Sequence, residues 1–335
     1  MLVGCGGICG AWLNSKSVQK HVSMVGFVDL DLKAARSRAD EFGAPDAQTG
    51  KDIKSMLDAV EPDVVFDCTT PNAHAGVAIL ALKHGCHVLG EKPMADTVAN
   101  ARRMLAAEKA SGKTGAVIQN RRFDQGIRAL GRFIDSGKLG RIHTVQSNFF
   151  IGAHFGGFRD HMKNVLLLDM AIHTFDAARA ITHADPLSAY CHEWNPPSSW
   201  YDQDASAVAI FEMTNDVVYT YQGSWCSEGR NTSWEGSWHI IGEKGSVTWD
   251  GGLGLRAQVV TSKDGFIRET RDIDVPLSVP KKYLGSHDGV IGNFLNAIRT
   301  GASPETAYSD NIKSLAMVEA AIKSAEKGRK INITI

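Results

Sequence analysis

The chain lacks the charge imbalance and the long apolar runs that mark nucleic-acid-binding and membrane proteins. Its 36 Lys and Arg against 37 Asp and Glu give a formal net charge of −1. This balance provides no electrostatic basis for binding nucleic acid or an anionic membrane. No apolar run approaches the roughly 20 residues that span a bilayer. We therefore expect neither nucleic acid nor a membrane as a partner.

The chain also lacks a C-x-x-C pair and a basic leader. Its six cysteines are scattered, which is typical of free thiols in a reducing compartment. They are Cys5, Cys9, Cys68, Cys86, Cys191 and Cys226. No basic residue precedes the apolar N-terminus, so a signal peptide is not indicated. We expect a cytoplasmic protein.

What is present is a soluble composition, 43% hydrophobic, and a length of 335 residues that suits two domains. Strand-like and helix-like segments alternate through the first third, which predicts a parallel α/β domain. The expected strands are 1–3, 23–31, 63–71, 87–93 and 115–123. Helices are expected near 17–22 and at 33–43, 74–85 and 97–112.

The pattern changes after about residue 142. Strand-like segments separated by turn signals predict a large, open, mainly antiparallel sheet. They are 143–152, 186–194, 205–213, 217–225, 237–249 and 256–263. Two amphipathic helices, 290–301 and 311–328, each end in Gly. We predict a Rossmann dinucleotide-binding domain at 1–119, of the α/β class, and an α+β substrate-binding and oligomerisation domain at 120–335.

The first strand runs into a glycine turn, "VGCGGICG". Gly4 and Gly6 fit the first two positions of G-x-G-x-x-G, while Cys9 takes the third. Such a turn, with Gly7 and Ile8 in it, would bring backbone close to a pyrophosphate. Asp29 follows the next strand, where a carboxylate binds a ribose 2′-hydroxyl, so NAD is favoured over NADP. Only three residues precede Gly4, and we expect the natural start to lie upstream.

A second candidate site is the apolar segment "LLLDMAIHTFDAA", residues 166–178. On an α-helix, Asp169, His173 and Asp176 would share one narrow stripe. Burying a charge there is unfavourable unless the charge is paired. The helix alone leaves three interpretations open: a core hydrogen-bond network, a metal site, or an acid–base group at a catalytic surface.

Several further motifs follow one another along the chain. They are Thr70-Pro71-Asn72 with His74, Gly85 with His87-Val88, Glu91-Lys92-Pro93, Asn120 to Phe123, Asp169 with His173 and Asp176, and Phe294 to Gly301. In this order they resemble the glucose–fructose oxidoreductase / inositol dehydrogenase family, Gfo/Idh/MocA, and the similarity covers essentially the whole chain. Lys92 ends a strand on the side of a parallel sheet where ligands bind. The resemblance also favours a cis Lys92–Pro93 bond.

The resemblance implies oxidation of a secondary alcohol on a sugar or cyclitol by NAD. It makes His173 the general base, Lys92 the group that stabilises the alkoxide, and Asp169 an orienting residue. The resemblance also implies a cofactor-binding role for Thr69, Asn72, His74 and Glu91, together with Lys92. Contacts with the substrate or with the rim of its site are implied for Arg122, Arg159, His161 and Trp12. Asp176 would be a structural buttress.

One departure leaves the substrate open, because "MKNVLL" replaces glycines that the family often has before its "LLD". Two alternatives also remain: a glycoside-cleaving enzyme of the same family, and a non-catalytic NAD-binding regulator. A metal at Asp169 and His173 has no convincing third ligand, so no metal is expected. Four tryptophans, Trp225, Trp234, Trp238 and Trp249, indicate either helix cover or a homodimer or homotetramer formed through the sheet.

Overall fold

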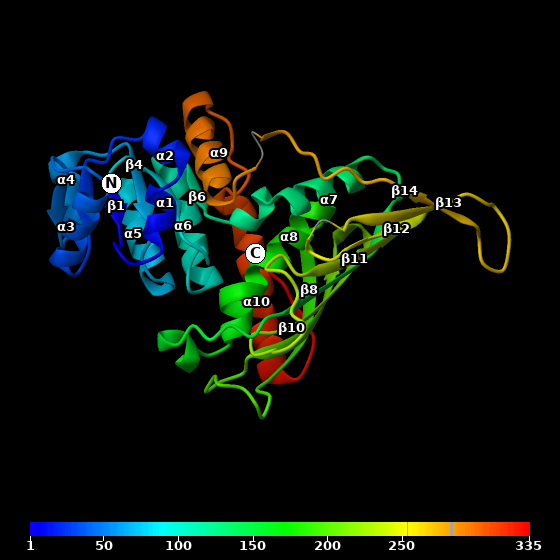
Figure 1. Cartoon of the computed structure of the whole chain (residues 1–335). Coiled ribbons are helices and arrows are strands. Elements are labelled where there is room, and N and C mark those ends of the chain that lie inside the picture. The colour runs from blue at the N-terminus through cyan, green and yellow to red at the C-terminus, as the bar shows by residue number, and fades with distance from the viewer. Residues whose placement is uncertain (253, 282–283) are drawn as a thin grey trace. The chain divides into compact units, whose positions relative to one another are not determined.

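The computed structural model describes residues 1–252, 254–281 and 284–335, and it contains two compact units (Figure 1). Unit 1 comprises Met1–Asn120 and Gly285–Leu315. Unit 2 comprises Arg121–Leu284 and Ala316–Ile335. The division differs from the two continuous segments expected from the sequence, because residues 285–315 pack in unit 1.

Unit 1 contains a six-stranded sheet in the order β3-β2-β1-β4-β5-β6, in which every pairing is parallel. The strands are β1 (Leu2–Val3), β2 (Gly26–Val28), β3 (Gln48–Gly50), β4 (Val64–Asp67), β5 (His87–Gly90) and β6 (Gly115–Val117). This order is that of the doubly wound dinucleotide-binding fold. The prediction of a Rossmann domain is confirmed.

Helices follow the strands of unit 1, and side chains cap several of them. Asp31, Asp52 and Thr97 each accept a backbone N–H bond at a helix start, which satisfies donors that a helix leaves unpaired. The helices are α1 (Cys9–Leu13), α2 (Lys16–His21), α3 (Leu32–Glu41), α4 (Ile53–Val60), α5 (Pro71–Lys83) and α6 (Val98–Ser111). β3 and α4 were not predicted from the sequence.

The returning segment belongs to unit 1 because α9 (His287–Thr300) packs there. The Asp288 carboxylate accepts bonds from Ser15 Oγ at 2.6 Å and from Ser17 N at 2.8 Å. Val290 and Phe294 are fully buried on the same helix. Apolar burial and this polar anchor together place α9 with the dinucleotide fold, although nearly all of unit 2 precedes it in the chain.

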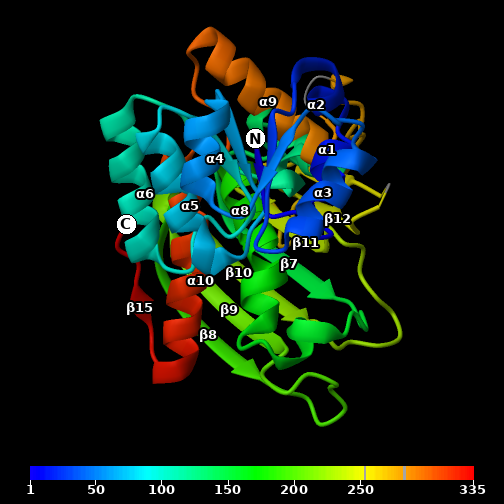
Figure 2. The ribbon, with the colours of Figure 1, turned by 90° about the vertical axis from the view of Figure 1, so that its left-hand side faces the viewer.

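Unit 2 contains a nine-stranded sheet in the order β14-β13-β12-β11-β7-β10-β9-β8-β15. Only β7 and β10 pair in parallel, so the prediction of a mainly antiparallel sheet is confirmed. The strands are β7 (Ile142–Phe150), β8 (Pro186–Trp194), β9 (Ser206–Met213), β10 (Val218–Ser224), β11 (Ser237–Gly242), β12 (Gly245–Trp249), β13 (Arg256–Val260), β14 (Thr270–Ile273) and β15 (Ile331–Asn332). Figure 2 shows β7 to β10 side by side.

Helices cover one face of this sheet and leave the other open. In β9, Phe211 and its alternate neighbours are buried while Val208 and Ile210 are exposed, as period-two alternation requires. Phe175 packs on Phe211 with ring centroids 4.8 Å apart. The covering helices include α7 (Gln125–Asp135), α8 (Ile172–Thr182) and the later part of α10 (Tyr308–Lys327).

Three of the four tryptophans lie in the core of unit 2, so they do not line an oligomer contact. Trp225, Trp238 and Trp249 are at most 3% exposed, and only Trp234, at 43%, reaches the surface. Of the two alternatives, the one in which the same domain covers the tryptophans is therefore correct for those three. All six cysteines are free, as predicted, and the structure also shows them to be buried. Among the described residues, every helix is too short or too polar to cross a membrane.

Candidate cofactor and catalytic site

The glycine turn after β1 is open to solvent where the motif requires backbone access. Gly4 has φ +88°, and a Cβ there would lie 2.6 Å from the Cys68 carbonyl. Only glycine fits this close approach of β1 to the β4 end. Gly6, Gly7 and Ile8 are exposed, and a Cβ on either glycine would meet no atom within 4 Å. A ligand phosphate could therefore approach this backbone directly.

Asp29 lies beside this turn, directly after β2. Its Oδ2 accepts the Cys5 N–H at 2.7 Å, and its Oδ1 accepts the Asp31 N–H at 2.9 Å. These two bonds fix the carboxylate next to the glycine motif, as expected from the spacing. The sequence analysis missed Arg38, whose Nη2 donates to the Gly6 carbonyl at 3.3 Å. No local motif indicates this contact, because it joins α3 to the turn across 32 residues.

The turn after β4 is organised by Asp67, which the sequence analysis did not single out. Its Oδ1 accepts the Thr69 hydroxyl at 2.5 Å, and its Oδ2 lies 3.0 Å from His74 Nδ1. Asp67 and His74 are each 1% exposed, whereas Asn72 is exposed. Thr69 and His74 thus shape the turn that presents Asn72. Asp67 could have been predicted as a site residue, because it is an acidic residue at the carboxyl end of a buried parallel strand.

Glu91, Lys92 and Pro93 follow β5, and the Lys92–Pro93 bond is cis, as the resemblance indicated. The Glu91 carboxylate accepts the Trp12 indole N–H at 2.8 Å and the Lys92 N–H at 3.2 Å. Trp12 is fully buried against Phe66, so its expected place at a substrate rim is wrong. Glu91 instead ties α1 to the end of β5. Lys92 is half-buried at the carboxyl edge of the sheet.

In unit 2, the predicted stripe begins on a π-helix, η3 (Leu166–Ala171), which continues into α8. The expectation of one uniform α-helix is wrong for this first part, because i→i+5 bonding turns the side chains differently. Asp169 lies in η3 and His173 in the first turn of α8. Single π-helical turns are frequent at functional sites. His173 is 7% exposed, and the Asp169 side chain 12%.

Asp176 is fully buried and forms a two-point ion pair with Arg122. Arg122 Nε lies 2.5 Å from Oδ2, and its Nη2 lies 2.6 Å from Oδ1. This geometry supports the prediction that Asp176 is a structural buttress. Arg122, expected as a substrate contact, has its guanidinium on Asp176 because a buried carboxylate requires a paired cation.

Arg159 and His161 lie in the loop before η3, on the short helix η2 (Gly157–His161). Arg159 Nε donates to Asp169 Oδ2 at 2.7 Å, and its guanidinium lies 4.9 Å from the centre of the Phe158 ring. Arg159 is thus brought together with Asp169. His161 is exposed, and its bond to Asp202 raises the pKa of the imidazole.

The sequence models of two family domains match most of the chain. Residues 1–119 match "Oxidoreductase family, NAD-binding Rossmann fold", and residues 127–248 match "GFO/IDH/MocA C-terminal domain". The chain belongs to the Gfo/Idh/MocA oxidoreductase family. The resemblance that the motifs indicated is confirmed, and so is the assignment as an oxidoreductase with an NAD-binding Rossmann fold.

Named relatives within Gfo/Idh/MocA span almost the whole chain. D-apiose dehydrogenase of Paraburkholderia graminis is 26% identical over 99% of this chain and 88% of its own length. Inositol 2-dehydrogenase of Rhizobium meliloti is 25% identical over 99% and 98%. An oxidoreductase from Agrobacterium radiobacter, solved with NAD+, L-tartaric acid and magnesium, superposes with a TM-score of 0.85 at 20% identity, covering 99% of this chain and 97% of that one. This last likeness shows the fold.

A further contact in this Gfo/Idh/MocA chain supports the start of the η3–α8 segment. Asn164, at φ +51°, lies two residues before Leu166 and donates from Nδ2 to Glu193 Oε2 at 2.7 Å. Glu193 belongs to β8, and burial raises the pKa of its carboxyl from 4.5 to about 7. This pair was not predicted from the sequence, because only the tertiary fold brings residues 164 and 193 together.

Glu193 predicts a specific pH dependence of stability. Its folded-state pKa exceeds its unfolded value, so its contribution is fully present below about pH 4.5 and is lost as the pH rises through 7. Glu193→Gln keeps an acceptor for Asn164 but removes the titration. We expect the variant to be more stable than wild type by roughly 2–3 kcal/mol above pH 8 and similar at pH 4.5. Urea unfolding at both pH values measures this. Equal stabilities above pH 8 would contradict it.

Proposed function

We propose that the chain is an NAD-dependent dehydrogenase that moves a hydride between a secondary alcohol of a sugar or cyclitol and nicotinamide. The observation that carries the proposal is Lys92, which follows β5 at the ligand-binding edge of an NAD-binding Rossmann fold. Two relatives, named D-apiose dehydrogenase and inositol 2-dehydrogenase, support the substrate class.

The residues of unit 1 fit a dinucleotide. The exposed Gly6 and Gly7 would hold the pyrophosphate, and Asp29 would bind a ribose hydroxyl. Thr69, Asn72 and His74 would form or shape the neighbouring wall. The contact of Glu91 with Trp12 supports an indirect role, in which Glu91 fixes the position of Lys92. When bound, the nicotinamide accepts or returns the hydride.

In the proposed chemistry, His173 takes the proton of the reacting hydroxyl through a ring nitrogen. An imidazole suits this role because its ordinary pKa lies near neutral pH. The Lys92 ammonium donates a hydrogen bond to the same oxygen and stabilises its developing negative charge. Asp169 orients the imidazole or the substrate, and its ion pair with Arg159 fixes the carboxylate in one position.

The substrate itself would meet residues of the loop before η3. Arg159 and the exposed His161 offer hydrogen-bond donors to sugar hydroxyls. Arg122, bound to Asp176, would act indirectly by fixing α8 and hence His173. These assignments give the loop the role of selecting the polyol, and the proton chemistry stays with Lys92 and His173.

The proposal predicts that Lys92→Ala and His173→Ala each lower kcat by about 10²-fold or more, the usual scale of acid–base contributions. A screen of sugars and inositols, followed at the NADH absorbance, supplies the substrate. NAD binding, measured by fluorescence titration, should persist in both variants. Lys83→Ala and His21→Ala are exposed controls that should keep wild-type kcat. Near wild-type turnover in either site variant would remove that residue from the mechanism.

A second prediction concerns cofactor choice at Asp29. The carboxylate repels a 2′-phosphate, while Arg38 beside Gly6 offers it a cation. Asp29→Ala should therefore lower the ratio of kcat/KM for NAD over NADP by roughly tenfold, equivalent to about 1.4 kcal/mol. Asp46→Ala, at an exposed site, should leave the ratio unchanged. If Asp29→Ala also leaves it unchanged, Asp29 does not select the cofactor.

We also propose that the open face of the unit 2 sheet forms a homodimer or homotetramer contact. Tyr190 and Ile210 are direct cross-strand partners on this face, and both are more than 40% exposed. Val208 and Val218 extend the apolar surface. Neighbouring exposed apolar groups on a sheet face mark protein–protein contacts.

Light scattering tests this contact. Ile210→Lys should convert the wild-type oligomer into a monomer, because a charge would be buried without a partner. Val25→Lys makes the same kind of change at a similarly exposed site in unit 1, and should leave the oligomer intact. A monomeric wild-type protein at micromolar concentration would refute the proposal.

A further inference from the structure

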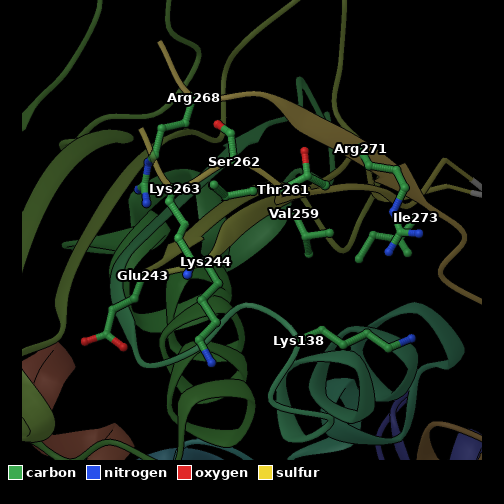
Figure 3. Close-up of a pocket in the computed structure, with 11 residues that line it drawn as sticks. Lys138, Glu243, Lys244, Val259, Thr261, Ser262, Lys263, Arg268, Arg271 and Ile273 are labelled. Atoms are coloured by element: carbon green, nitrogen blue, oxygen red, sulfur yellow. The ribbon is translucent and has the colours of Figure 1, made fainter. Parts of the chain in front are cut away.

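A cation-lined cavity of about 650 Å³ lies within unit 2, and none of the residues assigned to the dehydrogenase reaction lines it (Figure 3). Its walls come from the turn after α7, the β11–β12 turn and the β13–β14 hairpin. The charged residues that line it are Lys138, Glu243, Lys244, Lys263, Arg268 and Arg271. In Figure 3, Lys263 and Arg268 lie on one side of the hollow, and Lys138 and Arg271 on the other.

Positively charged side chains outnumber negatively charged ones in the lining of this cavity, five to one. Glu243 is the one carboxylate in the lining. It is bound outside the set, to Arg141 Nε at 3.1 Å and Arg141 N at 3.3 Å. Within the described ranges, the five lining cations form no ion pair with a carboxylate. Like charges gathered around one hollow repel each other, and an anion placed between them would relieve that repulsion.

Backbone contacts fix the walls of the cavity. Lys244 N donates to the Leu139 carbonyl at 2.8 Å, and Val260 N donates to the Lys244 carbonyl at 2.9 Å. A Cβ on Gly245 would lie 2.1 Å from the Gln258 carbonyl oxygen, so β12 and β13 pack too closely for a side chain there. A preformed cavity needs little ordering when a ligand binds, which favours affinity.

The remaining lining defines the class of ligand. Val259 and Ile273 offer apolar surface, and Thr261 and Ser262 offer hydroxyl groups. The volume lies in the range of small-molecule sites. The chain as a whole has a net charge of only −1, which does not favour a nucleic acid. We propose that this cavity is a second ligand site, for a small polyanion with at least two negative charges on a short organic body.

Phosphate esters and polycarboxylates share this chemistry, and calorimetric titration distinguishes them. The probes are glucose 6-phosphate, citrate and inorganic pyrophosphate, each added to the full-length protein at low ionic strength. At least one should bind, and its affinity should fall when the ionic strength rises from about 0.05 to about 0.2 M, because salt screens these charges. The preferred probe identifies the acid group. Absence of binding by all three would overturn the proposal.

Two variants locate the site. Lys244→Gln and Arg271→Gln should each weaken binding of the preferred probe by about tenfold. Arg256→Gln is the matched control, since Arg256 is exposed on β13 but lies outside the lining. It should change the affinity by less than about twofold. Thermal unfolding curves check that all three variants are folded. If Arg256→Gln weakens binding as much as the two cavity variants do, the cavity is not the binding site. The same conclusion follows if the two cavity variants keep the wild-type affinity.

Discussion

The buried pair of Arg122 and Asp176 is the constraint on which the candidate catalytic helix depends. A carboxylate with no solvent exposure is tolerated only beside a cation that bonds both of its oxygens. Losing one partner of such a pair costs about 3–5 kcal/mol. Because Arg122 lies in η1 (Asn120–Phe123), the pair fixes α8 against the segment that follows the dinucleotide fold. His173 lies three residues before Asp176, on the helix that this contact fixes.

Side-chain networks rather than single residues shape both parts of the proposed machinery. In unit 1, Asp67 fixes Thr69 and His74, and Glu91 fixes Trp12. In unit 2, Arg159 binds Asp169, and Glu193 binds Asn164, just before η3. Each functional group therefore contacts a buried or half-buried partner. This contact restricts the functional side chain to fewer conformations, so less ordering is needed before reaction.

Local patterns in the sequence predicted most strands, because a strand that is buried on one or both faces has apolar residues at regular positions. Residues 64–66 of β4 and 88–89 of β5 are apolar, and β9 alternates along its length. The missed strand β3, "QTG", is a polar edge strand that has no such pattern. The π-helical turn at 166–171 was missed because its apolar residues also suit an α-helix.

The candidate site was predictable where a motif fixes the backbone, as in the glycine turn and the Glu91-Lys92-Pro93 segment. Partners distant in sequence were not predictable. Nothing near Trp12 indicates that it is buried on Glu91, 79 residues away. Likewise, neither Arg122 nor Asp176 reveals its partner 54 residues distant. Such pairings depend on the tertiary fold, and no local spacing encodes them.

The return of residues 285–315 to unit 1 has a consequence for biosynthesis. The ribosome makes the glycine turn before residues 121–284 of unit 2, and α9 only after them. Domains generally fold as units during synthesis. Here the N-terminal unit must wait for Asp288 and Phe294 before its surface around α1 and α2 is covered. The nascent dinucleotide fold thus stays incomplete while a second, larger sheet emerges and folds behind it.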